Sequence, residues 1–176
     1  MESPAQVASR QFEAAVQAGG VEILKFKIPG MRLCAPLENA IKVLPLMELQ
    51  PVPGAPRYLR GLMNLHGRNI PVIDLAARLG YGGYTRYTLE TPILLCEYEG
   101  LRSGLIVDKV IGVETLEQDA WQQTPAFDNA GLLLPGTVQT QFGSLQVLCI
   151  ENVIAIDTGA THSPVAPGDD DEEASA

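Results

Sequence analysis

Two histidines, His66 and His162, are the side chains in this sequence best suited to acid–base or metal chemistry. A metal site usually contains a close pair of ligands, as in CxxC or HxxxH, and the sequence has no such pair. A nucleophilic site needs a base held against Ser or Cys, but no cysteine lies near His66 and no GxSxG motif is present. The sequence therefore predicts no metal site, no cofactor and no enzyme.

A stretch rich in glycine and tyrosine follows in the middle of the chain. The segment Gly80–Tyr84, "GYGGY", is not a phosphate-binding loop, because it comes after a helical pattern instead of leading into one. Tyr81, Tyr84 and Tyr87 lie near Arg86, but a site for single-stranded nucleic acid also needs a strongly basic groove, which is missing. We interpret the stretch as an exposed connector.

The charge balance indicates what kind of partner the protein has. The net charge is -9, and five of the acidic residues form the run Asp169–Glu173, which leaves the rest of the chain near -4. Binding to nucleic acid or to anionic lipid requires clustered Lys and Arg. The composition therefore argues against both and favours a protein partner.

The cysteines and the start of the chain bear on the compartment. Cys34, Cys96 and Cys149 are odd in number, far apart and embedded in apolar runs, so we expect reduced core residues. The first residues include Glu2 and Arg10 and contain no apolar stretch typical of a secretion signal. No apolar run is long enough to span a membrane. We therefore expect a cytoplasmic protein without membrane insertion.

The body of the chain, about residues 21–157, is a series of short segments rich in Val, Ile and Leu, separated by Gly and Pro. This pattern is typical of a small β-barrel or sandwich. Hairpins are expected to turn at Pro29-Gly30 and at Glu99-Gly100. Asp74 and Gly80 are suited to begin and end a helical turn in "DLAARLG". The sequence predicts an all-β body with short helices.

An internal repeat is also present. The second half aligns with the first at an offset of 70 residues, and the alignment continues at an offset of 75 after a change in loop length. Matched pairs are Leu24 with Leu94, Gly30 with Gly100, Ile41 with Ile111, Val43 with Val113, Gly61 with Gly136 and Val72 with Val147. We read each unit, about 21–85 and 91–157, as a barrel of about five strands. Because neither unit is large enough to bury much core alone, the two should pack together.

Both ends of the chain differ from this body. Residues 1–20 could form a short amphipathic helix from about Ser9, ended by Gly19-Gly20, or could be frayed. Residues 158–176 are rich in Pro, Gly and acidic side chains, with little to bury, so an acidic disordered tail is expected.

Two motifs in the body resemble those of the CheW-like domain family. Residues 51–80, "PVPGAPRYLRGLMNLHGRNIPVIDLAARLG", look like its signature, a Pro-Gly-X-Pro turn followed by a Gly-hydrophobic-hydrophobic-Asn-Leu-Arg-Gly strand and a strand ending in Asp-Leu. Gly104–Val113, "GLIVDKVIGV", resembles the motif of the second half. The resemblance covers about 21–157. It implies two SH3-like five-stranded β-barrels that share a core, in agreement with the repeat.

The resemblance also implies a function. Family members are non-enzymatic adaptors of bacterial chemosensory arrays, in which they connect the cytoplasmic tips of methyl-accepting chemoreceptors to the regulatory domain of a CheA-type histidine kinase. By this analogy the receptor hairpin binds in a groove between the barrels, and the barrel edges bind the kinase. We expect a cytoplasmic monomer in isolation, and a ring or array at the membrane receptors in complex.

Partner-binding residues are expected on two strands and the turn that follows the second. They are Ile41, Lys42, Val43, Leu44, Gly61, Leu62, Met63, Asn64, His66 and Gly67. The apolar members and Asn64 would form a receptor-facing wall, and the two glycines would permit close backbone approach. Because neighbouring residues of a strand face opposite sides, about half of this set is expected to be buried instead.

Two positions depart from the family pattern. The family usually has Glu where this chain has Lys42 and Arg where it has His66, and we expect the two positions to be neighbours that form an ion pair in typical members. With both residues changed, the same charge-assisted contacts cannot form. We therefore hypothesise a divergent adaptor of a specialised chemosensory system, such as one controlling pili, surface behaviour or second-messenger output.

Three alternative functions make different demands on the sequence. A regulatory module could bind a different signalling partner through the same groove and barrel edges. A coupling protein that also carries a receiver domain is disfavoured, because no segment of that length with an acidic pocket is present. An enzyme built on β-barrels would require that His66→Ala abolish turnover while the fold is kept.

Overall fold

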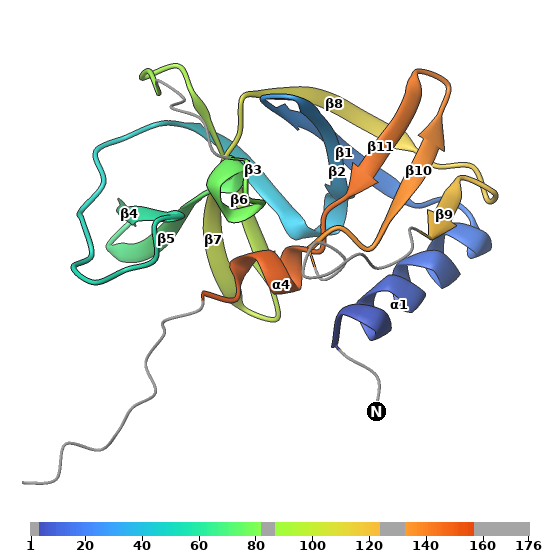
Figure 1. Ribbon diagram of the computed structural model, residues 1–176, viewed down its shortest axis with the longest axis horizontal. Helices are drawn as coiled ribbons and strands as arrows, with labels where there is room; N and C mark the ends of the chain where they lie inside the picture. Colours follow the sequence, from blue (N-terminus) through green and yellow to red (C-terminus); the bar gives the residue numbers. More distant parts are fainter. Residues whose placement is uncertain (1–3, 82–86, 124–132, 157–176) are drawn as a thin grey trace, which may run out of the picture.

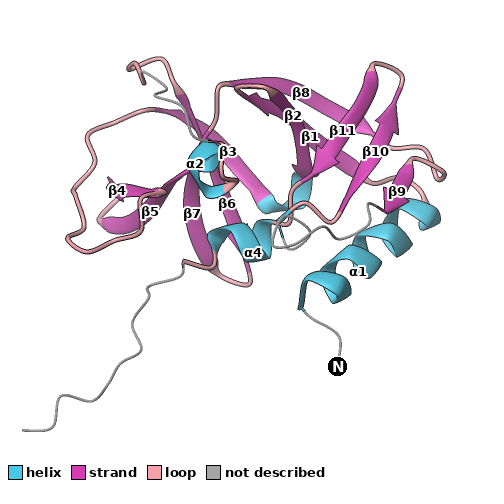
Figure 2. Cartoon of the chain, in the orientation of Figure 1, coloured by secondary structure: helices cyan, strands magenta, loops and turns pink. Residues whose placement is uncertain are grey.

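The computed structural model describes residues 4–81, 87–123 and 133–156 (Figure 1). Strands predominate in these residues (Figure 2). In chain order the elements are α1 (Pro4–Ala18), β1 (Glu22–Ile28), β2 (Met31–Pro36), the 3-10 helix η1 (Leu37–Asn39), β3 (Ala40–Pro45), β4 (Leu59–Leu65), β5 (Arg68–Asp74), α2 (Leu75–Arg78), β6 (Pro92–Tyr98), β7 (Leu101–Ile106), β8 (Lys109–Thr115), β9 (Trp121–Gln123), β10 (Gly136–Thr140), β11 (Gly143–Val147) and α4 (Ile150–Ile154). The prediction of an all-β fold with short helices is confirmed.

Tight turns form the two hairpins that the sequence predicts. In the β1–β2 hairpin Ile28 pairs with Met31, and in the β6–β7 hairpin Tyr98 pairs with Leu101. Each loop therefore consists of the two residues expected, Pro29-Gly30 and Glu99-Gly100. Gly30 has φ +80° and Gly100 has φ +83°, a left-handed conformation that glycine adopts without a steric cost.

The strands form two sheets with a common topology. The larger sheet has the order β8-β1-β2-β11-β10-β9, and the smaller has the order β3-β6-β7-β5-β4. Under the repeat, β1 corresponds to β6, β2 to β7, β3 to β8, β4 to β10 and β5 to β11. Apart from β9, the two orders are then identical strand by strand. The repeat in sequence is therefore a repeat in structure.

Each repeat unit gives its first hairpin to the sheet of the other unit. The β1–β2 hairpin pairs with β8 and, in parallel, with β11. The β6–β7 hairpin pairs in the same way with β3 and β5. The expected boundaries, 21–85 and 91–157, thus describe the repeat but not the sheets. Because the two units are alike, each hairpin fits the same place in either unit. Sequence periodicity alone therefore cannot show whether a hairpin pairs within its own unit or with the other unit.

The chain that follows β3 closes the smaller sheet. Gln50 and Leu62 of β4 form a bridge, in which each N–H donates to the other's carbonyl oxygen at 2.8 Å. Since β3 and β4 are the outer strands of this sheet, the bridge connects its two ends. The sheet therefore takes the closed form of a barrel.

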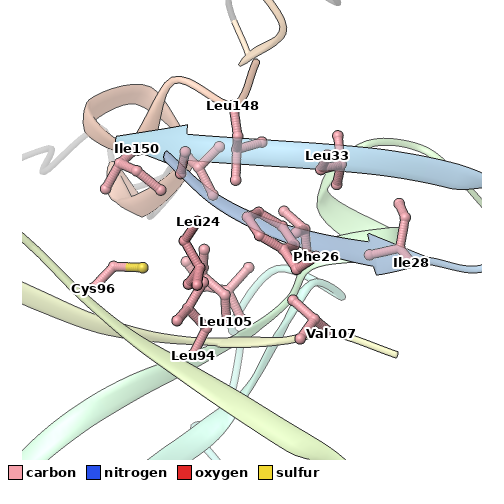
Figure 3. Close-up of a cluster of buried hydrophobic side chains, with 14 of the residues drawn as sticks. Leu24, Phe26, Ile28, Leu33, Leu94, Cys96, Leu105, Val107, Leu148 and Ile150 are labelled. Carbon is pink, nitrogen blue, oxygen red and sulfur yellow. The ribbon is translucent and has the colours of Figure 1, made fainter. Parts of the chain in front are cut away.

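The hydrophobic interior has three parts. One cluster belongs to the smaller sheet and includes Met63, Val72 and Ile93. A second belongs to the larger sheet and includes Ile23 and Val138. The third lies between the sheets and takes side chains from both exchanged hairpins (Figure 3); it includes Leu24, Phe26, Leu33, Leu94, Cys96 and Leu105. The expected core shared by two units is therefore present.

Helix α1 covers one end of the larger sheet and lies beside β9 (Figure 1). It starts about five residues before the expected Ser9 and ends before Gly19, whose φ is +86°. Val16 is fully buried in the cluster of the larger sheet. The ring of Phe12 meets Trp121 edge-on, with 5.3 Å between ring centroids. Of the two expectations for this extension, the helical one applies.

The helices α2 and α4 are equivalent in the repeat and are linked by one side chain. Asp74 caps α2 as expected, because its Oδ1 accepts a hydrogen bond from the N–H of Ala77 at 3.2 Å. The guanidinium of Arg78 donates to the carbonyl oxygens of Asn152 at 3.0 Å and Ala155 at 3.1 Å. Arg78 thereby satisfies carbonyls at the end of α4. The expected acidic tail and part of the tyrosine-rich connector, including Tyr84 and Arg86, lie outside the described residues.

Candidate partner-binding surface

The outer strand β3 presents apolar side chains to solvent. Ile41 is 43% exposed and Val43 is 47% exposed, and Lys42 between them is also exposed. Leu44 is half-buried against the interior of the smaller sheet. Branched apolar residues on an outer strand favour association with another protein, because their exposure leaves apolar surface in water.

A β-bulge interrupts the pairing of β3 at Ile41. Ala40 pairs with Cys96 and Lys42 pairs with Leu95, so Ile41 is an extra residue without a partner on β6. A bulge twists the strand and redirects its side chains. The alternation of buried and exposed residues expected from the sequence is not found at Ile41, Lys42 and Val43, which are all exposed.

The equivalent strand β8 repeats this surface. Ile111 is 47% exposed and Val113 is 51% exposed. Lys25 pairs with Gly112 and Phe26 with Val110, so Ile111 is again the unpaired residue of a bulge. The predicted site missed these residues, although the repeat matches Ile41 with Ile111 and Val43 with Val113. Applying the repeat to the first set of site residues would have found the second.

The predicted residues of β4 are divided between core and surface. Met63 is 0% exposed inside the smaller sheet, so its side chain offers no surface to a partner. Leu62 is half-buried and Asn64 is exposed. Gly61 is buried, and a Cβ at this position would lie 2.5 Å from the carbonyl oxygen of Gln50. The close backbone approach at Gly61 is made by Gln50 of the same chain, and approach by a partner at this position stays a prediction.

His66 and Gly67 form the two-residue turn between β4 and β5. His66 has φ +51° and Gly67 has φ +81°, and both are exposed. The N–H of Gly67 donates to the Asn64 side-chain oxygen at 3.1 Å. A Cβ at Gly67 would meet nothing within 4 Å in this chain, and the positive φ suits the turn. Because the space beside Gly67 is open, the expected close approach of a partner backbone stays a prediction.

Lys42 and His66 lie in different parts of the smaller sheet. Lys42 lies on β3, at one end of the smaller sheet, whereas His66 follows β4, at the other end. Within the described residues, neither takes part in an ion pair. Because the chain after β3 also bridges to β4, the strand order does not decide whether the two side chains face each other, and their expected proximity stays a prediction.

The potential metal ligands are dispersed and the cysteine thiols are buried in the described part of the chain. Among the residues that the structure describes, no three His, Cys, Asp or Glu side chains are placed to hold a metal ion. The three cysteines are free and buried, as predicted. Burial, with a smaller contribution from Glu114, raises the pKa of Cys34 to about 12, and burial raises the pKa of Cys96 to about 12. Both thiols are therefore protonated at neutral pH and are poor nucleophiles.

No helix within the described ranges has the length and apolar character needed to cross a membrane.

Comparison with known proteins places this fold and surface in a family. The model of the CheW-like domain matches residues 22–157, from β1 to just beyond α4. The chemotaxis protein CheW of Thermotoga maritima is 29% identical over 133 residues, which cover 76% of this chain and 87% of that protein. The protein PilI of Pseudomonas aeruginosa is 28% identical over 106 residues, which cover 60% of this chain and 59% of that protein.

A solved structure supports the same assignment of fold. The crystal structure of the scaffolding protein TtCheW from Thermoanaerobacter tengcongensis has a TM-score of 0.72 and 22% sequence identity, and the alignment covers 79% of this chain and 95% of that chain. The prediction of two SH3-like barrels is confirmed by this likeness together with the two sheets. The family model matches most of the chain, and this protein therefore belongs to the CheW-like domain family.

Proposed function

We propose that this protein is a non-enzymatic adaptor that couples the signalling tips of chemoreceptors to a CheA-type histidine kinase in a bacterial chemosensory array. Membership of the CheW-like family supports this role, and several of the matched relatives are named chemotaxis proteins. The monomer would join a ring or array through its partners.

One observation carries the proposal most directly: the molecule has two equivalent apolar outer strands. An adaptor that connects two proteins needs two separate contact surfaces. β3 and β8 are in different sheets, and each exposes an Ile and a Val beside a bulge. We assign Ile41, Val43 and Leu44 of β3, with Leu62 and Asn64 of β4, to the receptor. We assign the β8 strand to the regulatory domain of the kinase.

Lys42 and His66 support a specialised system instead of the array that controls flagella. Both side chains are exposed, so a partner can contact them directly. Typical family members have Glu at position 42 and Arg at position 66. A receptor suited to those residues would meet the positive charge of Lys42 where it expects a negative one. We therefore propose that the receptors of this protein differ in charge from those of the flagellar array.

Co-sedimentation with a receptor cytoplasmic fragment and with the kinase regulatory domain, both from the native host, tests the proposed coupling. Val43→Asp should weaken receptor binding and Val113→Asp should weaken kinase binding, each by about tenfold, because a charge replaces an apolar contact. Leu89→Asp is the matched control, since Leu89 is 80% exposed but lies outside both strands.

If the unmodified protein bound neither the receptor fragment nor the kinase domain, the proposal would be contradicted. It would favour the alternative of a regulatory module with a different signalling partner. For the specialised system, the double substitution Lys42→Glu/His66→Arg should increase binding to flagellar receptors. If the unmodified chain bound flagellar receptors as tightly as the ordinary adaptor does, the proposal of a specialised system would be contradicted.

A further inference from the structure

A cavity of about 540 Å³ lies between α1 and the rest of the molecule. One wall consists of Ala8, Gln11, Phe12 and Ala15 of α1. The facing wall comes from the start of β1, from η1, from the end of β6 and from the start of α4. This volume lies within the range of pockets that hold small organic ligands. A second cavity, beside Asp74, measures about 40 Å³ and has room only for water.

The lining of the larger cavity is apolar with negative charge. Its apolar part includes Leu37, Leu148 and Ile150. Among the described residues that line it, the only charged ones are Glu22, Glu38 and Glu151.

No ion pair in the described part of the chain neutralises these carboxylates, and Glu151 has a side-chain hydrogen bond with the hydroxyl of Tyr98. The ion pairs found there, Lys25–Glu114, Lys27–Asp108 and Arg102–Glu97, involve none of the three. The acidic run Asp169–Glu173 has the same sign of charge and is therefore an unsuitable occupant.

The cavity is distinct from the proposed adaptor surfaces. No residue of β3 or β8 lines it. Its α1 wall lies outside residues 22–157, which the family model matches. The pocket thus depends on a segment that this chain has in addition to the family domain, and ligand binding there does not require the proposed coupling function.

We infer that this cavity binds a small organic cation, an amine or guanidine carried on an apolar body. The carboxylates of Glu22, Glu38 and Glu151 hold the cation, and the apolar lining contacts the body. Tyr98, which also lines the cavity, stays neutral, because burial and the charge of Glu151 raise the pKa of its hydroxyl. Its hydroxyl donates to Glu151, and its oxygen can still accept a hydrogen bond from an ammonium or guanidinium group.

Amide chemical-shift titration of the full chain tests the charge preference with three probes that share one apolar body: phenethylamine, phenethyl alcohol and phenylacetate. The amine should shift the amides of Ala15, Leu37 and Glu151. The alcohol should bind more weakly, and phenylacetate should leave these amides unchanged. Equal shifts with all three probes, or amine shifts confined to other parts of the chain, would overturn the inference.

Variants test the location. Ala15 is exposed and lines the cavity, so Ala15→Trp should block it and abolish the amine-induced shifts. Ala14→Trp, next to it on α1 and not part of the lining, should leave them intact. Equal responses of the two variants would overturn the location.

A second pair of variants tests the role of the carboxylates. Glu38→Gln/Glu151→Gln should weaken amine binding by about fivefold, because two partly exposed ion pairs are removed. Glu13→Gln/Glu117→Gln, which removes the same charge outside the lining, should not weaken it.

A parallel titration uses the peptide acetyl-Leu-Arg-Leu-amide. Binding of the peptide without binding of the amine would show recognition of a protein segment, and would overturn a free small cation as the ligand.

Discussion

At the scale of single residues, Gly61 determines how the smaller barrel closes. Its φ of +148° favours glycine, and a Cβ would lie 2.5 Å from the carbonyl oxygen of Gln50. The same carbonyl accepts the N–H of Leu62 in the bridge that joins the ends of the sheet. A side chain at position 61 would therefore push apart the two segments that close the barrel.

Gly61→Ala should lower the free energy of unfolding by about 2 kcal/mol, because the added methyl group collides with backbone that cannot move freely. Gly67→Ala is the comparison, since Gly67 also has a positive φ but open space around it. It should cost about 1 kcal/mol, from the left-handed conformation alone. Urea unfolding of both variants checks the difference, and a larger loss for Gly67→Ala would contradict this account.

The sequence predicted individual residues well where local chemistry determines the structure. The cap at Asp74, the turns at Gly30 and Gly100 and the buried thiols all follow from residue type and spacing. The exposure of Ile41 was expected, but the bulge that exposes it depends on pairing with β6, which a local pattern does not contain. The surface on β8 was missed although the repeat pointed to it.

At the scale of elements, α1 is an integral part of the larger barrel. Its sequence left a helix or a frayed segment open, because a short amphipathic stretch is stable only when a surface is available for packing. The structure supplies that surface, in which Val16 and Phe12 contact the cluster that includes Ile23 and Trp121. The extension therefore stabilises the domain next to which it lies.

Val16→Ala should lower the free energy of unfolding by about 2 kcal/mol, because Val16 is 0% exposed and its truncation leaves a void. Val7→Ala, on the same helix, should have almost no effect, since Val7 is 40% exposed. Denaturant unfolding monitored by Trp121 fluorescence measures both. Equal stabilities of the two variants would mean that α1 is not packed as described.

At the scale of the whole molecule, the exchange of hairpins makes the two repeat units interdependent. The larger sheet combines residues before β3 with residues after β7, whereas the smaller sheet is continuous from β3 to β7. The sequence predicted the repeat, the strands and the shared core. It could not predict the exchange of hairpins. Leu24 and Leu94 occupy equivalent positions of the repeat and pack in the same core, so the apolar pattern is the same whether or not the hairpins are exchanged.

A fragment of residues 1–85 should not fold cooperatively, because its β1–β2 hairpin lacks β8 and β11 and its smaller sheet lacks β6 and β7. Mixing it with a fragment of residues 86–176 should restore a cooperative unfolding transition. Circular dichroism during urea titration measures this.

The fragment of residues 38–108 serves as the control, since it contains all five strands of the smaller sheet and its interior cluster. It should retain more strand structure than residues 1–85. A cooperative transition of residues 1–85 alone would contradict the interdependence.

The exchange of hairpins also sets an order of events during synthesis. The β1–β2 hairpin leaves the ribosome first, but its partners β8 and β11 are made last, after the whole smaller sheet. Translation at about 5–20 residues per second leaves this apolar hairpin unpaired for several seconds. The smaller sheet can form in the nascent chain during that interval. Its side chains that belong to the shared core can then pack against the β1–β2 hairpin. Slow codons placed after β7 would lengthen this interval and increase the exposure of the nascent hairpin to aggregation or to chaperones.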